Sequence, residues 1–508
     1  MKKFLALIIV ICFVAKTKSL NAQTHTQSSG TTTVSNETYS TSTDDESTIK
    51  ITGGTLNIDT CTITKTGDAS DMDNSNFYGL NAAVLNYGSS GVINMSGGTI
   101  TTNGAGANGF YAYAGSSTIS DVVISCTANS SRGLFATGGG SITASNVTAT
   151  TAGSNSSVIA TDRGGGSVYV TGGTFNCTGT DAAVIYSTGT IEVSGIIGSS
   201  SQGEIAVIEG SNSVTISGGS DITSGSSSRG IMALQSGSGD AEGSEAYFTI
   251  TGGTLTTTNS NAPLVEVVTN ATGYIYLNSV TTSIASGILM LVDYNTRWTT
   301  NGATGNLFLN GDYTYTGDIQ ADSYCTANTS ILSGATLEGK INTENTALLA
   351  TLTMDDTSSW TVTGTSYING LITNPSITDD SVTNITGNGY NVYYTESTNT
   401  ALNSKTFKLV GGGYLMPVSS AGTGVSDVTI NTLSVYPNPA QTTLTITNSS
   451  DTGSDFSYLI YNITGRIVTS NTTSYGGQID VTGLANGIYQ IKIITENNEI
   501  ISKKFIKE

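Results

Sequence analysis

The sequence predicts an all-β protein: a right-handed parallel β-helix followed by a small C-terminal Ig-like β-sandwich. Three observations predict the helix. A unit of strand, Gly-Gly corner and strand recurs, a second pattern repeats about every 24 residues, and the 508 residues include 61 glycines but only 11% charged residues. Thr, Ser, Asn, Val and Ile fill the chain, and these residues favour strands and turns over helices.

The Gly-Gly unit is clearest at residues 168–177, where Val168 and Val170 alternate with polar residues ahead of Gly172 and Gly173. Alternation with period two indicates a strand, and glycine turns the chain without a steric cost from a Cβ atom. Variants of the unit recur at residues 51–56, 93–100, 214–222 and 248–255.

Adjacent apolar residues mark the same repeat a second time, in steps of 23 to 26 residues with one step of 33. The long step contains a polar insert at 237–245, which we expect to be a surface loop. The pairs are Val84-Leu85, Phe110-Tyr111, Leu134-Phe135, Val158-Ile159, Val184-Ile185, Val207-Ile208, Ile231-Met232, Leu264-Val265 and Leu289-Met290.

A period near 24 with two or three short strands matches one turn of a parallel β-solenoid. The blades of a β-propeller, the alternative, need antiparallel hairpins and a period nearer 40. Coils stack about 4.8 Å apart, so residues 49–430 would form roughly 16 coils. Parallel crossovers are right-handed by strong preference, which predicts the hand of the helix.

The apolar pairs leave two alternatives open, because neighbouring residues of a strand face opposite sides. Either a bend buries both members, or the second members form an outward stripe. Such a stripe would mark a partner surface or a face that another segment covers. Its members would be Tyr111, Phe135, Ile159, Ile185, Ile208 and Met232.

The first 22 residues have the pattern of a secretory signal peptide: Lys2 and Lys3, an apolar run at 4–14, and Ala22 before the expected cleavage site. The run is too short to span a membrane, and no later stretch approaches 18 apolar residues, so we predict no transmembrane segment. Residues 23–48 are rich in Ser and Thr. They predict a flexible lead-in or a frayed first coil.

The cysteines and the charge each exclude a class of interaction. Without the four lysines of the signal peptide the chain keeps 14 basic and 37 acidic residues, a net charge of −23, which argues against a nucleic-acid or anionic-membrane partner. The remaining cysteines are far apart and form no C-x-x-C pair, so we expect small buried thiols. They are Cys61, Cys126, Cys177 and Cys325.

The end of the repeat region is expected to be a cap, at about residues 370–420, because an open solenoid end exposes unpaired strand edges. Segments 358–367 and 405–417 resemble the closing coils of autotransporter-type β-helix passengers. The repeat then stops, and short strand-like segments over about 75 residues predict the small β-sandwich.

Residues 431–508 carry several motifs in a fixed order, and they closely resemble the type A C-terminal sorting domain of the type IX secretion system. The resemblance implies that this segment is a removable address read by the type IX machinery, and that the protein is secreted or held at the outer membrane. The acidic residue usual ahead of Gly-Arg is missing, with Asn462 or Thr464 in that region. The matching residues are Tyr436, Pro437, Asn438, Pro439, Gly465, Arg466, Leu484, Gly487, Tyr489, Lys503 and Lys504.

The charged residues of the solenoid decide between two function classes. Polysaccharide lyases and hydrolases need paired carboxylates and a base, and the only histidine, His25, lies in the lead-in. We therefore predict a structural or adhesive surface protein with a glycan or host-matrix ligand, with a polysaccharide-degrading enzyme as the alternative. The candidate residues for the alternative are Asp71, Asp73, Asp355, Asp356, Asp379, Asp380, Arg132, Arg163, Arg229 and Arg297.

Two further sites are weighed and not predicted. No D-x-D-x-D-G calcium loop is present, and we predict no metal and no cofactor. Thr-rich runs such as 254–258 raise the idea of an ice-binding array, but Thr, Ser and Asn mix freely, which is typical of ordinary solvent-facing strand positions.

Overall fold

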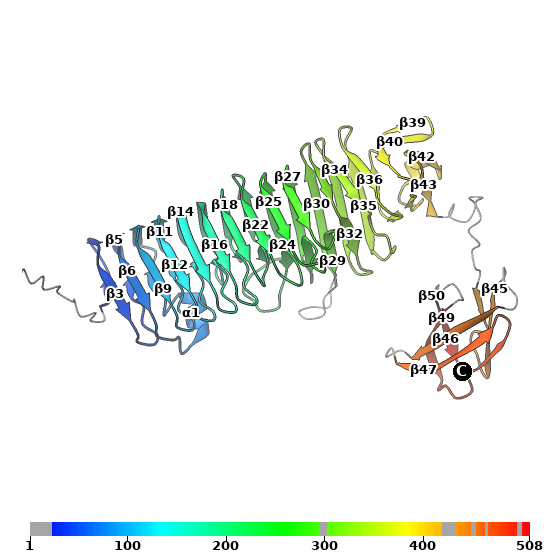
Figure 1. Cartoon of the computed structure of the whole chain (residues 1–508), viewed down its shortest axis with the longest axis horizontal. Helices are drawn as coiled ribbons and strands as arrows, with labels where there is room; N and C mark the ends of the chain where they lie inside the picture. Colours follow the sequence, from blue (N-terminus) through cyan, green and yellow to red (C-terminus); the bar gives the residue numbers. More distant parts are fainter. Residues whose placement is uncertain (1–22, 295–301, 419–432, 449–453, 463–465, 495–499) are drawn as a thin grey trace, which may run out of the picture. The chain divides into compact units, whose positions relative to one another are not determined.

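The computed structural model describes residues 23–294, 302–418, 433–448, 454–462, 466–494 and 500–508. The predicted fold class is confirmed. The protein is all-β and 2% helical, with a parallel β-solenoid of about 15 turns and C-terminal antiparallel sheets consistent with a small sandwich (Figure 1). Two compact units divide between Gly422 and Thr423. Among the described residues, no helix has the length and apolar character needed to cross a bilayer.

One face of the solenoid is a 12-stranded parallel sheet, to which each coil adds one short strand. Strands of successive coils pair in register, as Phe110 with Leu134 and Leu134 with Ile159. In order across the sheet, the strands are β1 (His25–Gln27), β4 (Ile49–Ile51), β7 (Val84–Tyr87), β10 (Phe110–Tyr113), β13 (Leu134–Thr137), β15 (Ile159–Thr161), β17 (Ile185–Ser187), β20 (Ala206–Glu209), β23 (Ile231–Leu234), β26 (Val265–Val268), β29 (Ile288–Asp293) and β32 (Asp318–Ala321).

The other faces belong to a 22-stranded parallel sheet made of two rows of strands, which join in β14 (Gly140–Thr151) and β16 (Gly166–Cys177). The first row also contains β2 (Thr31–Ser35), β5 (Gly54–Asp59), β8 (Gly91–Ser96), β11 (Ser116–Ser120), β18 (Thr190–Ser194), β21 (Ser213–Ser217), β24 (Glu245–Thr251), β27 (Thr272–Asn278), β30 (Thr304–Asn310), β33 (Thr326–Leu332), β35 (Leu349–Met354) and β38 (Ile372–Thr373). The second row contains β3 (Thr38–Thr41), β6 (Thr62–Lys65), β9 (Thr99–Thr102), β12 (Val123–Cys126), β19 (Ile197–Ser200), β22 (Asp221–Ser224), β25 (Thr254–Thr257) and β28 (Thr281–Ile284).

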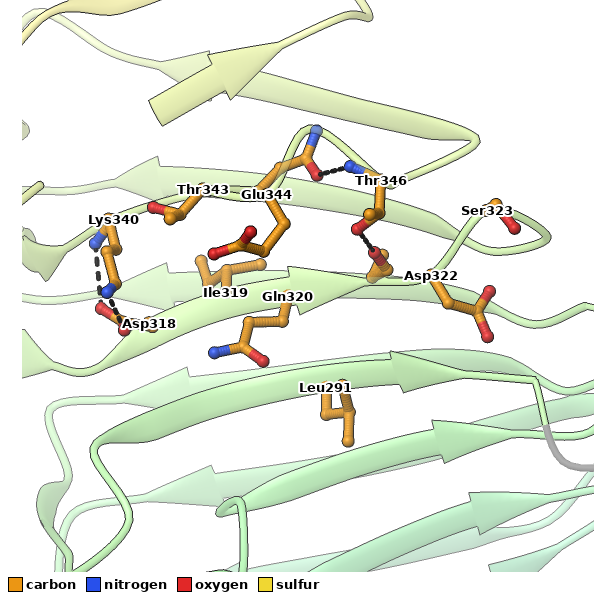
Figure 2. Close-up of a pocket in the computed structure, with 12 residues that line it drawn as sticks. Leu291, Asp318, Ile319, Gln320, Asp322, Ser323, Lys340, Thr343, Glu344 and Thr346 are labelled. Carbon is orange, nitrogen blue, oxygen red and sulfur yellow. Dashed lines mark hydrogen bonds and ion pairs between the residues drawn. The ribbon is translucent and has the colours of Figure 1, made fainter. Parts of the chain in front are cut away.

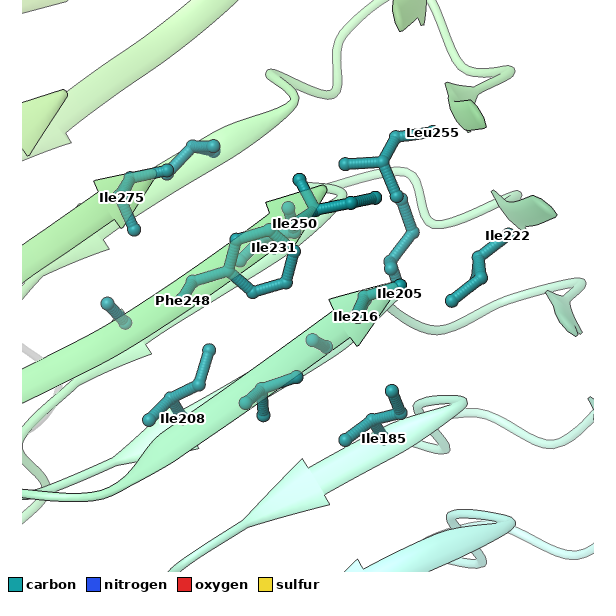
Figure 3. Close-up of a cluster of buried hydrophobic side chains, with 14 of the residues drawn as sticks. Ile185, Ile205, Ile208, Ile216, Ile222, Ile231, Phe248, Ile250, Leu255 and Ile275 are labelled. Carbon is teal, nitrogen blue, oxygen red and sulfur yellow. The ribbon is translucent and has the colours of Figure 1, made fainter. Parts of the chain in front are cut away.

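Inward side chains of these sheets fill the solenoid with one continuous apolar core. Figure 3 shows part of it, where Ile216 and Phe248 of the 22-stranded sheet lie near Ile231 of the 12-stranded sheet. The Gly-Gly corners allow the coils to stack closely. Gly173 has a φ of +104°, and a Cβ atom there would lie 2.2 Å from the carbonyl oxygen of Val147 in the preceding coil, so only glycine fits.

The four cysteines of the described chain are free and buried, as predicted. Cys126 and Cys177 belong to one inward row, with Thr151 between them. Burial raises the pKa of the Cys126 thiol to about 11 and that of Cys177 to about 12, so both stay protonated.

The solenoid begins earlier than residue 49. Strands β1, β2 and β3 pair in parallel with β4, β5 and β6 of the next coil. Of the two alternatives for residues 23–48, the structure therefore shows a first coil, and His25 lies on a strand with its ring 6.1 Å from that of Tyr39. The Thr-rich composition is compatible with strands because threonine is β-branched.

The last coils form a nine-stranded sheet, and an antiparallel hairpin closes its end within the segment expected to be a cap. The hairpin joins β42 (Phe407–Val410) to β43 (Tyr414–Pro417), and a short 3-10 helix, η1 (Thr400–Leu402), precedes it. The remaining strands of this sheet are β31 (Thr314–Thr316), β34 (Thr336–Gly339), β36 (Ser359–Val362), β37 (Ser366–Ile368), β39 (Ile377–Thr378), β40 (Ser381–Thr386) and β41 (Val392–Tyr394).

The second unit has a separate core and two antiparallel sheets. Leu444, Ile460, Ile491 and Phe505 are fully buried between their neighbours in this core. One sheet consists of β44 (Leu433–Tyr436), β45 (Thr443–Asn448) and β48 (Gln478–Asp480). The other consists of β47 (Ile467–Ser474), β46 (Asp455–Asn462), β49 (Gly487–Ile494) and β50 (Ile500–Lys507).

Candidate functional site

A short helix, α1 (Met72–Tyr78), covers part of the outer face of the 12-stranded sheet. Asp71 caps its N-terminus by accepting hydrogen bonds from the backbone N–H groups of Asp73 and Asn74, whereas the sequence placed Asp71 and Asp73 in turns. The Tyr111 hydroxyl donates to the carbonyl oxygen of Asn76 at 2.6 Å, which holds the helix on the sheet.

The expected outward stripe is wrong for three of its six members. Ile159 and Ile185 face the core because they align with Leu134 rather than with Phe135. Ile208 pairs with Ser187, two places beyond Ile185, and therefore also faces the core. Tyr111 and Phe135 do face outward, but they are fully buried in a cluster beside α1, and Met232 is buried with Leu234 and Val268. Both members of these apolar pairs are therefore buried, except for Val207, which is half-buried, and no exposed stripe remains there.

The predicted arginines and aspartates do not gather into one site. Asp355 closes a turn by accepting hydrogen bonds from the backbone N–H groups of Thr357 and Ser358. The other three aspartates beyond residue 350 also lie at turns: Asp356, Asp379 and Asp380. Arg297 lies outside the described residues. The other arginines pair with carboxylates on the solenoid: Arg132 with Asp162 (3.6 Å), Arg163 with Asp240 (2.6 Å), and Arg229 with Glu204 (3.4 Å) and Glu266.

A buried acidic network on the 12-stranded sheet was missed by the sequence interpretation. The Tyr186 hydroxyl donates to Glu209 at 2.8 Å, and Ser236, just before the insert, also donates to Glu209. Asp162 accepts from the backbone N–H of Arg163 at 2.8 Å. Burial raises the pKa of Asp162 to about 6, although the charge of Arg132 opposes the shift. The sequence does contain a signal for this network, because its members follow one another at intervals of one repeat: Asp162, Tyr186 and Glu209.

Asp162 should make the stability of the solenoid depend on pH. Its folded pKa of about 6 exceeds the unfolded value of about 3.9, so the protonated carboxyl stabilises the fold below pH ~4, and this contribution is lost as the pH rises through about 6. The difference corresponds to a loss of roughly 3 kcal/mol. Denaturant unfolding at pH 4 and pH 7 should show this loss in the wild type and not in Asp162→Asn.

The control for this measurement is Asp121→Asn, which removes an exposed carboxylate from a nearby coil. It should keep the pH dependence of the wild type. Equal pH dependence of the wild type and Asp162→Asn would show that the Asp162 carboxyl titrates alike in the folded and unfolded chain.

A pocket of about 470 Å³ lies near the end of the 12-stranded sheet. Figure 2 shows Asp318 and Lys340, whose charged groups are 3.4 Å apart, at one end and Asp322 at the other, with Gln320 and Glu344 between them. Such a mixture of carboxylates, an amide and an ammonium group can bind a polar ligand.

Asp322, which lines one end of this pocket, lies beside the carboxyl of Asp293 on the adjacent strand. Burial, the charge of Asp322 and a hydrogen bond between the two side chains raise the pKa of Asp293. The carboxylate of Asp322 also accepts from the backbone N–H groups of Tyr294 (2.6 Å) and Tyr324 (2.9 Å), whose rings lie 4.7 Å apart. Asp293 therefore keeps its proton to a higher pH than an ordinary aspartate does.

In the second unit, the chain brings the first and last sorting motifs together. Asn438 accepts a hydrogen bond from the backbone N–H of Ile506 at 2.8 Å and donates to the carbonyl oxygen of Lys504 at 3.4 Å. Tyr436 and Lys503 are exposed. The motif containing Pro437 and Pro439 is thereby fixed beside the C-terminal strand.

The middle motifs lie where β46 ends, where β47 begins and where β49 begins. The backbone N–H of Arg466 donates to Asn462 at 3.0 Å beside the loop between β46 and β47, and Gly465 lies outside the described residues. Leu484 packs against the core ahead of Gly487, where β49 begins. The Tyr489 ring is stacked on Phe505, with ring centroids 5.6 Å apart.

Comparison with protein families matches residues 434–508 to the secretion system C-terminal sorting domain. No curated protein and no solved structure that was compared with the chain matches it. The match begins within β44 and lies inside the second compact unit, and its sorting function implies export and delivery to the cell surface. The protein is therefore a secreted β-solenoid that carries a C-terminal sorting domain of the type IX secretion system.

Proposed function

We propose that this protein is an adhesive or structural surface protein, in which the solenoid is the working part and the sorting domain is the address. The observation that carries the proposal is the outer face of the 22-stranded sheet, which presents rows of hydroxyl and amide side chains. Asn94 donates to Asn57 at 3.0 Å and Asn310 to Asn278 at 2.9 Å, so the rows are ordered across coils. An ordered surface of hydrogen-bonding side chains that continues over many coils suits recognition of an extended partner.

To reach the cell surface, the protein must first cross the inner membrane. Residues 1–22 lie outside the described residues, and their assignment as a signal peptide stays a prediction from the sequence. In this proposal the signal peptide delivers the chain to the periplasm, and the type IX machinery then recognises residues 434–508 and places the solenoid outside the cell, at the outer membrane or released.

A polysaccharide-degrading enzyme is the second candidate, and one observation favours it. Asp293 and Asp322 are adjacent carboxyls with a shared hydrogen bond, beside a pocket that contains further polar groups. A carboxyl with a raised pKa, such as that of Asp293, can act as a general acid in glycoside cleavage.

One experiment separates the two candidates. Beads coated with the full chain should attach to polysaccharide or host-matrix surfaces, while the protein in solution should release no reducing or unsaturated sugars from neutral or acidic polysaccharides. Sugar release that Asp293→Asn or Asp322→Asn abolishes would contradict the adhesive function and support the enzyme. Asp356→Asn, in the turn between β35 and β36, is the matched control.

A further inference from the structure

A shallow groove of about 420 Å³ lies on the first row of the 22-stranded sheet, in the middle of the solenoid. Its floor includes Ser167, Thr190 and Ser213, which are partners in register on three successive coils. Their span, with the next coil, is roughly 14 Å at about 4.8 Å per coil. No charged side chain lines the groove in the described part of the chain.

Tyr247 forms one end wall of the groove. It lies on the coil after Ser213, in register with it, and its ring is stacked on Tyr274 of the following coil, with centroids 4.9 Å apart and planes at 8°. Because Tyr274 covers one ring face, the opposite face is turned toward Ser213 and the groove. The Tyr247 hydroxyl donates to Glu245 at 3.0 Å, which fixes the ring in this orientation.

The rest of the lining consists of Ser211, Asn212 and five glycines, which leave the corner without side chains at their positions. A Cβ atom at Gly189 would lie 2.3 Å from the carbonyl oxygen of Gly166, so the corner stays free of side chains. The strands under the groove are paired on both sides, and a peptide has no open strand edge to join here. Lining of this kind offers small polar groups beside one flat apolar surface.

We infer that this groove binds a segment of a neutral polysaccharide, with one sugar ring stacked on the free face of Tyr247 and sugar hydroxyls bonded to Ser167, Thr190 and Ser213. A pyranose ring has an apolar C–H face that fits an aromatic ring, and hydroxyl groups around its edge that fit serine and threonine. An acidic glycan or a nucleic acid would bring charges that the uncharged groove does not neutralise. The inference rests on the proposed adhesive function and names its ligand class.

Isothermal titration of the full chain with linear glucan, mannan and xylan pentasaccharides tests the inference, with a galacturonan pentasaccharide as the acidic counterpart. At least one neutral pentasaccharide should bind. Tyr247→Ala should weaken its affinity about tenfold, because one stacking face is lost, and Tyr247→Phe should retain it. Ser213→Tyr, which fills the groove without changing Tyr247, should abolish binding.

The matched control is Tyr276→Ala, since Tyr276 is likewise outward on this sheet and stacked on Phe308 (4.5 Å), but lies outside the groove. It should bind like the wild type. The inference is overturned if no neutral pentasaccharide binds, if galacturonan binds more tightly, or if Tyr247→Ala keeps the affinity of the wild type and Ser213→Tyr still binds. If beads coated with Tyr247→Ala still attach like the wild type, the groove is not the binding site, but the adhesive function stands. If the protein binds the sugar but coated beads do not attach, only the adhesive function is refuted.

Discussion

Deletion of residues 433–508 should leave the solenoid in the periplasm and remove it from the cell surface. The deleted segment folds around its own core and contains the whole matched sorting domain, so its loss removes the address without touching the solenoid core. Fractionation of the native host, followed by immunoblotting and antibody labelling of intact cells, measures the effect. We expect surface labelling to disappear and the periplasmic fraction to hold the protein.

Val468→Ser is the control for this deletion, because it changes an exposed side chain on β47 and leaves the core of the domain intact. It should be displayed like the wild type. Normal surface labelling of the chain that lacks residues 433–508 would contradict the role assigned to this domain.

Phe135→Ser should destabilise the solenoid by about 3–5 kcal/mol, the usual cost of emptying a buried aromatic site. Phe135 is fully buried although it faces away from the central core. Its ring lies 4.6 Å from that of Tyr111, and the Arg132 guanidinium lies over it at 4.6 Å. Denaturant unfolding measures the loss, and α1 should become sensitive to proteases in the variant.

Val123→Ser provides the comparison, since Val123 is an outward residue on β12 that is 49% exposed. Its substitution should change the free energy of unfolding by no more than about 0.5 kcal/mol. Equal stability of the two variants would show that the 12-stranded sheet is open at Phe135 and that α1 does not cover it.

The repeating part of the fold could be predicted from sequence because its determinants are local. Gly173 must be glycine where its coil touches Val147, and alternation at Val168 and Val170 follows directly from strand geometry. The sorting domain could be predicted for a different reason. Its motifs at 436–439 and 503–504 keep a fixed order, and the structure explains this by the contacts of Asn438 with the last strand.

Features that depend on the length of a turn could not be predicted. A shift of one residue in the loop before β15 decides whether Val158 or Ile159 aligns with Leu134, and an apolar pair alone does not reveal it. Helix α1 has only seven residues inside one long turn, with Asp71 and Gly79 as its end signals. The groove at Tyr247 depends on which side chains lie next to each other on successive coils. It therefore depends on the strand register, which the turn lengths set.

The most direct test of the adhesive function compares cells that display the full chain with cells that display the signal peptide and sorting domain without residues 23–418. Both should reach the surface, because both keep the sorting domain. Attachment to surfaces coated with neutral polysaccharide or host matrix is then counted under flow. We expect attachment by cells with the full chain and its loss without the solenoid; equal attachment by both would contradict the adhesive function.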